Sequence, residues 1–332
     1  MNRYKNKFLV FILLALFTFS ASFAGDLDRV GTDSGVQTVI PVGSRGLSMA
    51  GADIATTRGV ESIYWNPAGL AALEGGEALF STRNMLADIN LNYFAVGYGV
   101  GDNTFGFSIK AFDFGEILRT TVEHMDGTGA TFSPTFSTIS LVYGRKVTDR
   151  IHFGARPKVI YENIERVTAT AFAADFGLQY ANLFEINGLA LGIFVKNIGT
   201  DMQYDGSALY TYSKDQVNDK PTSHDEYRKI ETESHKLPTS INMGLTYTRG
   251  MNFGNLTVAG TYQRNNYMKD DIRLGLELAI ADMLFIRTGN NFYIGEVDSD
   301  KYADEENDAV DDNYGSADYQ FTVGAGLKYN LM

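Results

Sequence analysis

Few of the residue types that carry enzyme chemistry occur in a productive pattern in this chain of 332 residues. The chain has no cysteine, which excludes thiolate nucleophiles, thiolate zinc sites and disulfides. It also has no Gly-x-Ser-x-Gly elbow and no phosphate-binding loop. The histidines lack the spacing of metal ligands; they are His124, His152, His224 and His235. We therefore expect no enzymatic activity and no cofactor, although a catalytic site assembled from distant strands would leave no motif.

An acidic run at residues 298–312 is a candidate calcium site, because carboxylate oxygens are the ligands that this hard cation prefers. The candidate ligands are Asp298, Asp300 and Asp304. However, Tyr302 and Ala303 stand where an EF-hand loop requires a ligand and a glycine. A solvated acidic loop without a bound ion is therefore the competing interpretation.

The first 24 residues have the pattern of a secretory signal peptide. Three basic residues precede an apolar run over residues 8–19, and small residues follow at the cleavage positions, Ser22 and Ala24. An uncleaved amphipathic anchor is the alternative. The whole chain carries 28 basic and 40 acidic side chains, a net charge of -12. Nucleic acid is not expected as a partner, because phosphate backbones require a basic face.

Beyond residue 75 the chain consists of segments about ten residues long in which apolar and polar side chains alternate. Over residues 104–112 one face carries Phe105 and Ile109, while the other carries Ser108 and Lys110. The same alternation recurs at residues 138–144, 151–162, 241–247, 272–280 and 320–329. This pattern predicts antiparallel β-strands with one apolar face and one hydrated face.

The connections between these segments alternate between short and long. Short turns fall at residues 101–103, 147–149, 183–187, 250–254 and 281–282. Longer or more polar connections fall at residues 84–89, 113–135, 164–168, 200–236, 266–270 and 294–317. A soluble β-sandwich also alternates, but it has no physical reason to keep its long loops at one end. We therefore predict an all-β membrane protein, an antiparallel transmembrane β-barrel in the outer membrane with about twelve readable strands.

Residues 25–75 lack the alternation and contain a small-residue stretch at 43–55. We expect short helices and turns packed as a plug in the barrel mouth, where small residues would pass close to the wall. The predicted organisation is a signal peptide at 1–24, an N-terminal plug at 25–75 and a barrel at 76–332. Its long external loops would lie near 113–135, 200–236 and 294–317.

The polar strand faces carry charges that we expect in a hydrated lumen: Lys110, Arg156, Lys158, Lys196, Arg273, Glu277, Arg287 and Lys328. A simpler interpretation is that these side chains only satisfy one another and the plug. Aromatic residues near strand ends, among them Phe112 and Tyr143, are expected at the level of the lipid headgroups.

Segments at residues 41–46, 49–52 and 63–70, the last reading Ile-Tyr-Trp-Asn-Pro-Ala-Gly-Leu, follow the signal peptide in a recognisable order. The chain resembles the PorV/PorQ family of outer-membrane proteins, which is related to the FadL-type hydrocarbon transporters. Strand segments at residues 195–199, 237–240 and 324–329 also look like that family, in its order. The resemblance spans most of the mature chain and implies a fourteen-stranded barrel with an N-terminal plug. Because this chain stops at Met332, about one hairpin early and without a terminal aromatic residue, we expect a truncated or atypical end, or else closure with twelve strands.

The resemblance implies a role in type IX protein secretion as a cargo-binding or shuttle component. The implied partners are outer-membrane lipid, secretion components and cargo sorting domains. The alternative is FadL-like transport of hydrophobic small molecules, in which a hydrophobic ligand would pass a constriction at the plug. Its candidate residues are Trp65, Asn66, Pro67, Ala68 and Gly69. A purely structural envelope barrel cannot be separated from these by sequence.

Overall fold

The computed structural model describes residues 33–217, 220–294 and 321–329. The predicted signal peptide and the calcium candidates Asp298, Asp300 and Asp304 lie outside the described residues. Among the described residues, no helix is both long and apolar enough to cross a membrane.

Antiparallel strands form one large sheet of thirteen strands, twelve of which follow a single path in chain order. That path comprises β1 (Gly76–Asn84), β2 (Asn90–Val100), β3 (Asn103–Asp113), β6 (Thr135–Lys146), β7 (Ile151–Ile164), β8 (Val167–Ala181), β9 (Leu189–Gly199), β13 (Ser240–Met251), β14 (Gly254–Asn265), β15 (Asp270–Ile280), β16 (Leu284–Ile294) and β17 (Phe321–Leu327). The thirteenth strand, β10 (Tyr204–Gly206), pairs with β8. Within the described residues β1 and β17 are the two edges of the path. The readable count of twelve strands is confirmed.

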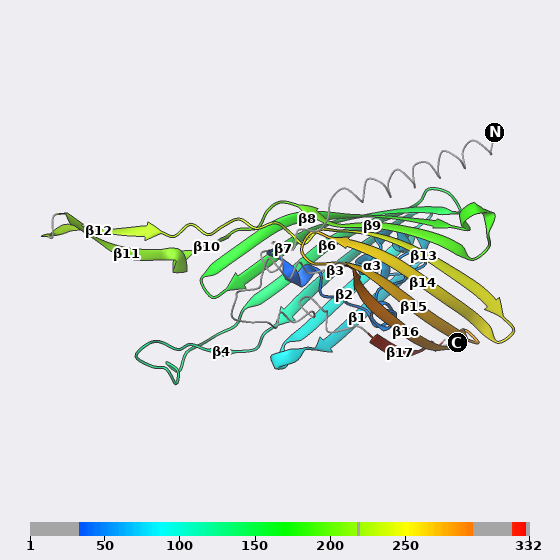
Figure 1. Cartoon of the computed structure of the whole chain (residues 1–332), viewed down its shortest axis with the longest axis horizontal. Coiled ribbons are helices and arrows are strands. Elements are labelled where there is room, and N and C mark those ends of the chain that lie inside the picture. The colour runs from blue at the N-terminus through cyan, green and yellow to red at the C-terminus, as the bar shows by residue number, and fades with distance from the viewer. Residues whose placement is uncertain (1–32, 218–219, 295–320, 330–332) are drawn as a thin grey trace, which may run out of the picture.

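The remaining elements are short. Before β1 lie η2 (Val36–Thr38), α2 (Ser44–Ser48), α3 (Ser62–Trp65) and η3 (Pro67–Ala72). Between the strands lie η4 (Leu86–Asp88), η5 (Leu183–Glu185) and η6 (Ser207–Leu209), and the hairpins of β4 (Ile117–Leu118) with β5 (Thr131–Phe132) and β11 (Tyr210–Val217) with β12 (Lys220–Lys229). The sheet curves around the helices that precede β1, and the β11–β12 hairpin extends far from it (Figure 1).

The polar face of the sheet is buried and its apolar face is exposed, which is the reverse of the arrangement in a soluble protein. On β3 the polar residues Ser108 and Lys110 are buried, whereas Phe105 has 58 % of its side chain exposed. Leu141 on β6 and Phe80 on β1 are likewise exposed, at 62 % and 68 %. Strands of about 9–11 residues suffice to cross a bilayer, and those of the path reach this length except for β17. An apolar outer wall around a polar interior is the arrangement of a transmembrane β-barrel, so the predicted fold class is confirmed.

The alternation of short and long connections is present only in part, because residues 182–188 between β8 and β9, at the short-turn end, form a longer connection than residues 266–269 between β14 and β15. The strand pairs β2–β3, β6–β7, β13–β14 and β15–β16 are joined by short turns at the same end, and the connections that carry the β4–β5 and β11–β12 hairpins lie at the other. The connection at residues 164–168, expected to be longer or more polar, is polar but not longer. Strands β7 and β8 pair up to Ile164 and Val167, so a turn of only two residues, Glu165 and Arg166, joins them.

The main hydrophobic core lies between the segment before β1 and strands β2, β3 and β6. The segment at residues 33–75, here called the plug, contributes Ile63, Tyr64 and Leu70 to it, and the wall contributes Leu91 and Val142, all buried. The plug therefore occupies the interior, packed against the wall.

Candidate functional site

Glycines on the inner face of the wall allow the plug to lie directly against it. A Cβ atom added at Gly154 on β7 would come within 3.0 Å of the Pro67 carbonyl carbon, and one at Gly177 on β8 would come equally close to Asn66 Oδ1. We call the set with such collisions the wall glycines: Gly99, Gly106, Gly144, Gly154, Gly177, Gly192, Gly244, Gly289 and Gly324. Because real non-bonded carbons do not approach so closely, any side chain here would displace the plug. The sequence interpretation placed the small residues that permit close approach on the plug, whereas the wall also supplies them.

Side chains from five wall strands donate hydrogen bonds to carbonyl oxygens of the plug. Their donors and acceptors are Lys110 to Ile40 (2.7 Å), Arg156 to Ile63 (2.7 Å), Gln179 to Ile54 (3.1 Å), Thr261 to Ala52 (2.6 Å) and Thr322 to Ser48 (2.9 Å). Buried carbonyls without a partner are costly. The inner wall thus satisfies the irregular plug backbone much as water would on a surface loop.

Trp65 is fixed inside the plug rather than in an open passage. Its indole N–H donates to the carbonyl of Val42 at 2.9 Å, and its ring meets Tyr64 edge-on with centroids 5.1 Å apart. A Cβ atom at Gly46 or Gly51 would collide with the indole. Because the chain has one tryptophan, the fluorescence of Trp65 reports on this packing.

Asn66 ties three segments together. Its Oδ1 caps η3 by accepting the N–H of Ala68 at 3.1 Å, while its Nδ2 donates to Ile54 of the plug at 2.8 Å and to Leu178 of β8 at 3.3 Å. An Asn at the N-cap followed by Pro is a strong helix start. The five predicted constriction residues, Trp65 to Gly69, are therefore brought together, but all are buried in the plug.

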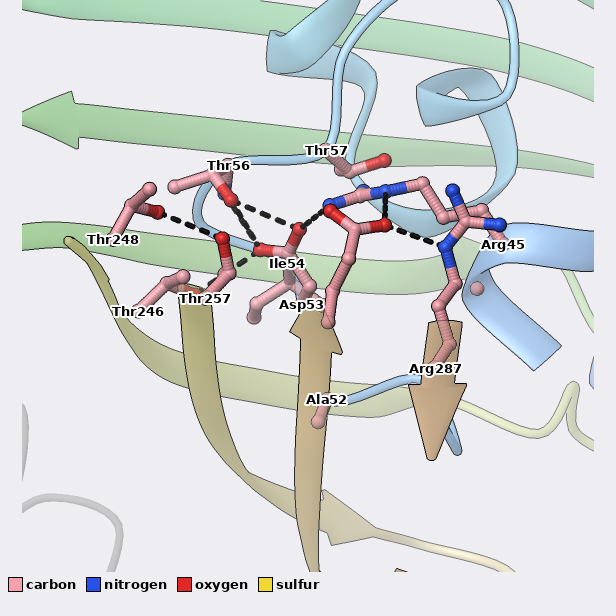
Figure 2. Close-up of polar contacts among 12 residues, drawn as sticks. Arg45, Ala52, Asp53, Ile54, Thr56, Thr57, Thr246, Thr248, Thr257 and Arg287 are labelled. Atoms are coloured by element: carbon pink, nitrogen blue, oxygen red, sulfur yellow. Dashed lines mark hydrogen bonds and ion pairs between the residues drawn. The ribbon is translucent and has the colours of Figure 1, made fainter. Parts of the chain in front are cut away.

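A charged network, here called the latch, joins the plug to β15 and β16 (Figure 2). Arg45 of the plug bonds Asp53 at 2.7 Å and Glu277 of β15 at 3.0 Å, and Arg287 of β16 donates to Glu277 as well. Asp53 also accepts from the backbone N–H of Thr56 at 2.9 Å. Two arginines and two carboxylates balance in charge, so the latch buries no uncompensated charge.

The plug carboxyls of the latch region have shifted pKa values. Burial acts to raise the pKa of Asp53, but the Arg45 guanidinium and the hydrogen bonds from Thr56 outweigh it, and the pKa lies below the usual value. Burial raises the pKa of Glu61, and its hydrogen bond from the Gly46 N–H offsets only part of this effect. The two carboxyls therefore respond to acid with opposite sign.

Acidification is expected to loosen the plug through Asp53. Its pKa is depressed in the folded protein, so the stability that it contributes is complete above the unfolded value, about 4, and is lost as the pH falls through the folded value. We expect the emission of Trp65 to shift to the red in that window, and Asp53→Asn to remove the step. The control Asp149→Asn, which changes an exposed residue in a connection between strands, should still show the acid-induced red shift. An unchanged acid step in Asp53→Asn would assign it to another group.

A second charged group lies on β7, β8 and β9. Arg156 Nε and Lys158 Nζ donate to Asp175 at 2.6 and 2.7 Å, and Asp175 also accepts the backbone N–H of Asn197 at 2.6 Å. Lys196 Nζ lies 3.8 Å from the centre of the Tyr64 ring, in cation–π contact. This group is built around one carboxylate and several cations.

Most of the predicted lumen charges belong to one of two clusters, and Arg273 forms a separate pair. Glu277 and Arg287 belong to the latch. Lys110, Arg156 and Lys196 lie around the Tyr64 ring, Lys158 joins them through Asp175, and Arg273 pairs with Asp271 at 2.6 Å. The expectation for Lys328 is wrong, because this residue follows the end of β17 and is exposed.

The sequence interpretation missed the carboxylates and the plug arginine of these clusters, namely Arg45, Asp53, Asp175 and Asp271. The period of two offers a signal for Asp175, which shares the inward parity of Ala173 and Gly177 on β8. Nothing in the sequence pairs Arg45 with Glu277, since 232 positions separate them.

Near the long-loop end the inner wall changes from polar to apolar. Leu91, Phe112 and Phe136 face one another across β2, β3 and β6 in direct register. Phe114 stacks on Phe112, with ring centroids 6.3 Å apart, and meets Phe136 edge-on, with centroids 4.9 Å apart. We call these four residues the mouth patch. The expected headgroup position of Phe112 is wrong, because its side chain points inward and is 6 % exposed.

Among the described residues, no group of three or more His, Asp or Glu side chains is placed to hold a metal ion. The arrangement of the site is instead that of a plugged interior with an apolar entrance and charged contacts below it.

No protein-family model matches the chain, and no curated protein matches it. Several solved structures are similar. The monoaromatic hydrocarbon channel CymD is 11% identical, with a TM-score of 0.46, and the match covers 77% of this chain and 85% of that one. The Pseudomonas putida toluene transporter TodX is 12% identical, with a TM-score of 0.40 and coverages of 76% and 92%. The Ralstonia pickettii toluene transporter TbuX is 13% identical, with a TM-score of 0.35 and coverages of 78% and 94%. Likenesses this distant do not assign the chain to a family.

Proposed function

We propose that the protein is an outer-membrane barrel that passes small hydrophobic molecules inward from the cell surface. The observation that carries this proposal is the mouth patch. Short turns of bacterial barrels face the periplasm, so the long-loop end, where the mouth patch lies, would face outward.

The mouth patch differs in chemistry from the rest of the inner wall. The inner wall elsewhere carries hydroxyls and charges, as Ser108, Lys110 and Ser140 show. Aromatic side chains facing a hydrated interior cost free energy unless something apolar covers them. Ile40 of the plug packs against the core cluster that includes Leu91 and Phe112, and Phe114 and Phe136 are only partly buried. A hydrophobic ligand that lay on these rings would gain the remaining apolar contact.

The titles of the similar structures name monoaromatic hydrocarbon channels and toluene transporters. Those descriptions belong to those proteins, and they agree with the class of ligand that the mouth patch favours. The expectation of a role in type IX secretion has no such support, since the similar structures named above are not secretion components. The alternative of hydrophobe transport is therefore the function that we propose.

Hydrophobe uptake is expected to depend on the mouth patch. Cells with an intact lipopolysaccharide layer that express the protein should take up the fluorescent hydrophobe 1-N-phenylnaphthylamine faster than cells that lack it. Replacing an aromatic ring by a polar amide forfeits about 1.5–3 kcal/mol of apolar contact. We therefore expect Phe114→Gln and Phe136→Gln, which alter the two partly exposed rings of the patch, to slow the initial uptake rate by about tenfold.

The matched control is Phe184→Gln, the same replacement at an exposed turn of the opposite end. It should leave the uptake rate unchanged. Equal uptake with and without the wild-type barrel would remove the proposal. Equal slowing by all three variants would point to a general folding defect and would contradict the assignment of the mouth patch.

A further inference from the structure

A small cavity lies between the plug and the inner wall, just below the mouth patch. Its free volume is about 10 Å³, which is roughly the space that a single water-sized particle requires. Three cationic side chains line it, Lys110, Arg156 and Lys158, and the other lining residues carry hydroxyl groups. No carboxylate is among the lining residues that the structure describes.

The charge around this cavity is unbalanced. Four cations gather there, because Lys196 and Lys110 both lie over the ring of Tyr64, at 3.8 and 4.9 Å, and Arg156 lies 5.8 Å from it. Lys158 belongs to the same group through Asp175. Asp175 is the carboxylate within bonding distance of this group in the described structure, and its oxygens already accept from Arg156, Lys158 and Asn197.

Around the cavity, hydrogen-bond donors are in excess of acceptors, just as positive charges are in excess of negative ones. An ammonium group has three N–H donors, and Lys110 Nζ uses one of them on the carbonyl of Ile40 at 2.7 Å. The hydroxyl of Thr138 lines the cavity, is buried and has no hydrogen-bond partner among the described residues. Several donors thus converge on one small space whose lining offers hydroxyl oxygens but no anionic acceptor, and leaving such donors unmatched is costly.

We propose that this cavity binds a single halide ion, chloride under physiological conditions. A monovalent anion would accept the free N–H groups of Lys110 and the hydroxyl of Thr138, and it would offset one surplus positive charge. A halide ion is smaller than a tetrahedral oxyanion or an organic carboxylate, so the lining side chains would have to shift least to admit it. The site lies among wall and plug residues alike, so the halide would act as a structural ion that holds the plug segment near Ile40 against β3.

Chloride is expected to stabilise the purified, full-length barrel in detergent. Thermal unfolding should be followed at constant sodium concentration while gluconate, which is too large for the cavity, is replaced by chloride. The unfolding midpoint should rise and then saturate, because ligand binding to the folded state follows mass action. Bromide should act like chloride, and sulfate like gluconate. Crystals soaked in bromide should show an anomalous peak within hydrogen-bonding distance of Lys110 Nζ.

Two variants test the residues that define the site. Lys110→Met should abolish the chloride-dependent shift, and Thr138→Val, which nearly preserves volume, should weaken the apparent chloride affinity about tenfold. The matched control Lys328→Met removes an exposed lysine and should retain the full shift. If Lys110→Met does not fold, Thr138→Val and the bromide peak still decide. Identical midpoints in chloride and gluconate, or a full chloride shift in both cavity variants, would overturn the proposal.

Discussion

Replacing Gly154 by alanine is expected to drive the plug away from the inner wall. The added Cβ would come within 3.0 Å of the Pro67 backbone, and a backbone cannot rotate aside as a side chain can. Overpacking of this kind costs about 1–3 kcal/mol. We expect a red shift of Trp65 emission, because Pro67, two positions further along the chain, loses its packing. We also expect a higher leak conductance across planar bilayers. Gly177→Ala should act in the same way through Asn66.

The matched control is Gly260→Ala on β14. A Cβ atom there would meet its nearest neighbour, Leu274, at an ordinary 3.5 Å, so conductance and emission should stay as in the wild type. If Gly154→Ala gave the same conductance and emission as Gly260→Ala, the plug would have to be loosely held, contrary to the contacts described above.

Removing the charge of Asp175 is expected to destabilise the protein more than any other single change of a polar residue considered above. Asp175 has no exposed surface and accepts from Arg156, Lys158 and Asn197. In Asp175→Asn the two cations would remain buried without a counter-charge, which costs about 3–5 kcal/mol. Urea unfolding in detergent, followed by Trp65 fluorescence, should show a lower midpoint.

The control for this change is Asp205→Asn. Asp205 pairs with Lys229 of β12 at 2.7 Å, but both side chains are solvent-exposed. Exposed ion pairs contribute little, so the unfolding midpoint should not change measurably. A similar loss in both variants would mean that net charge, and not the buried pairing, governs stability.

The strands and their two faces could be predicted because period two is a local property. The alternation with their nearest neighbours predicts which face Phe105 and Lys110 occupy. As predicted, Phe105 is exposed and Lys110 is buried. Errors arose where a local pattern was ambiguous. Polar residues at 164–168 suggested a loop, but two of them suffice for a tight turn, and Phe112 suggested the headgroup level although its parity directs it inward.

The candidate site could be predicted only in part. Parity places Lys158 and Glu277 on the inner face, yet it does not say which side chain lies opposite across the lumen. The wall glycines illustrate the same limit, because Gly154 is inward by parity but matters only through the position of Pro67. Partners of this kind depend on how an irregular segment folds back into the interior, which no short-range period encodes.

The contacts between wall and plug also bear on how the wall acquires its shape. Hydrogen bonds to plug carbonyls come from β3, β7, β8, β14 and β17, strands spread along most of the sheet. An isolated sheet can adopt a range of curvatures, since its own ladder bonds tolerate variable twist. Because the plug is hydrogen-bonded to five strands of the wall, it restricts the range of curvatures that the wall can adopt. The plug thus sets the curvature of the wall. If an additional hairpin widened the barrel, the hydrogen bonds between wall and plug would break before those between neighbouring strands.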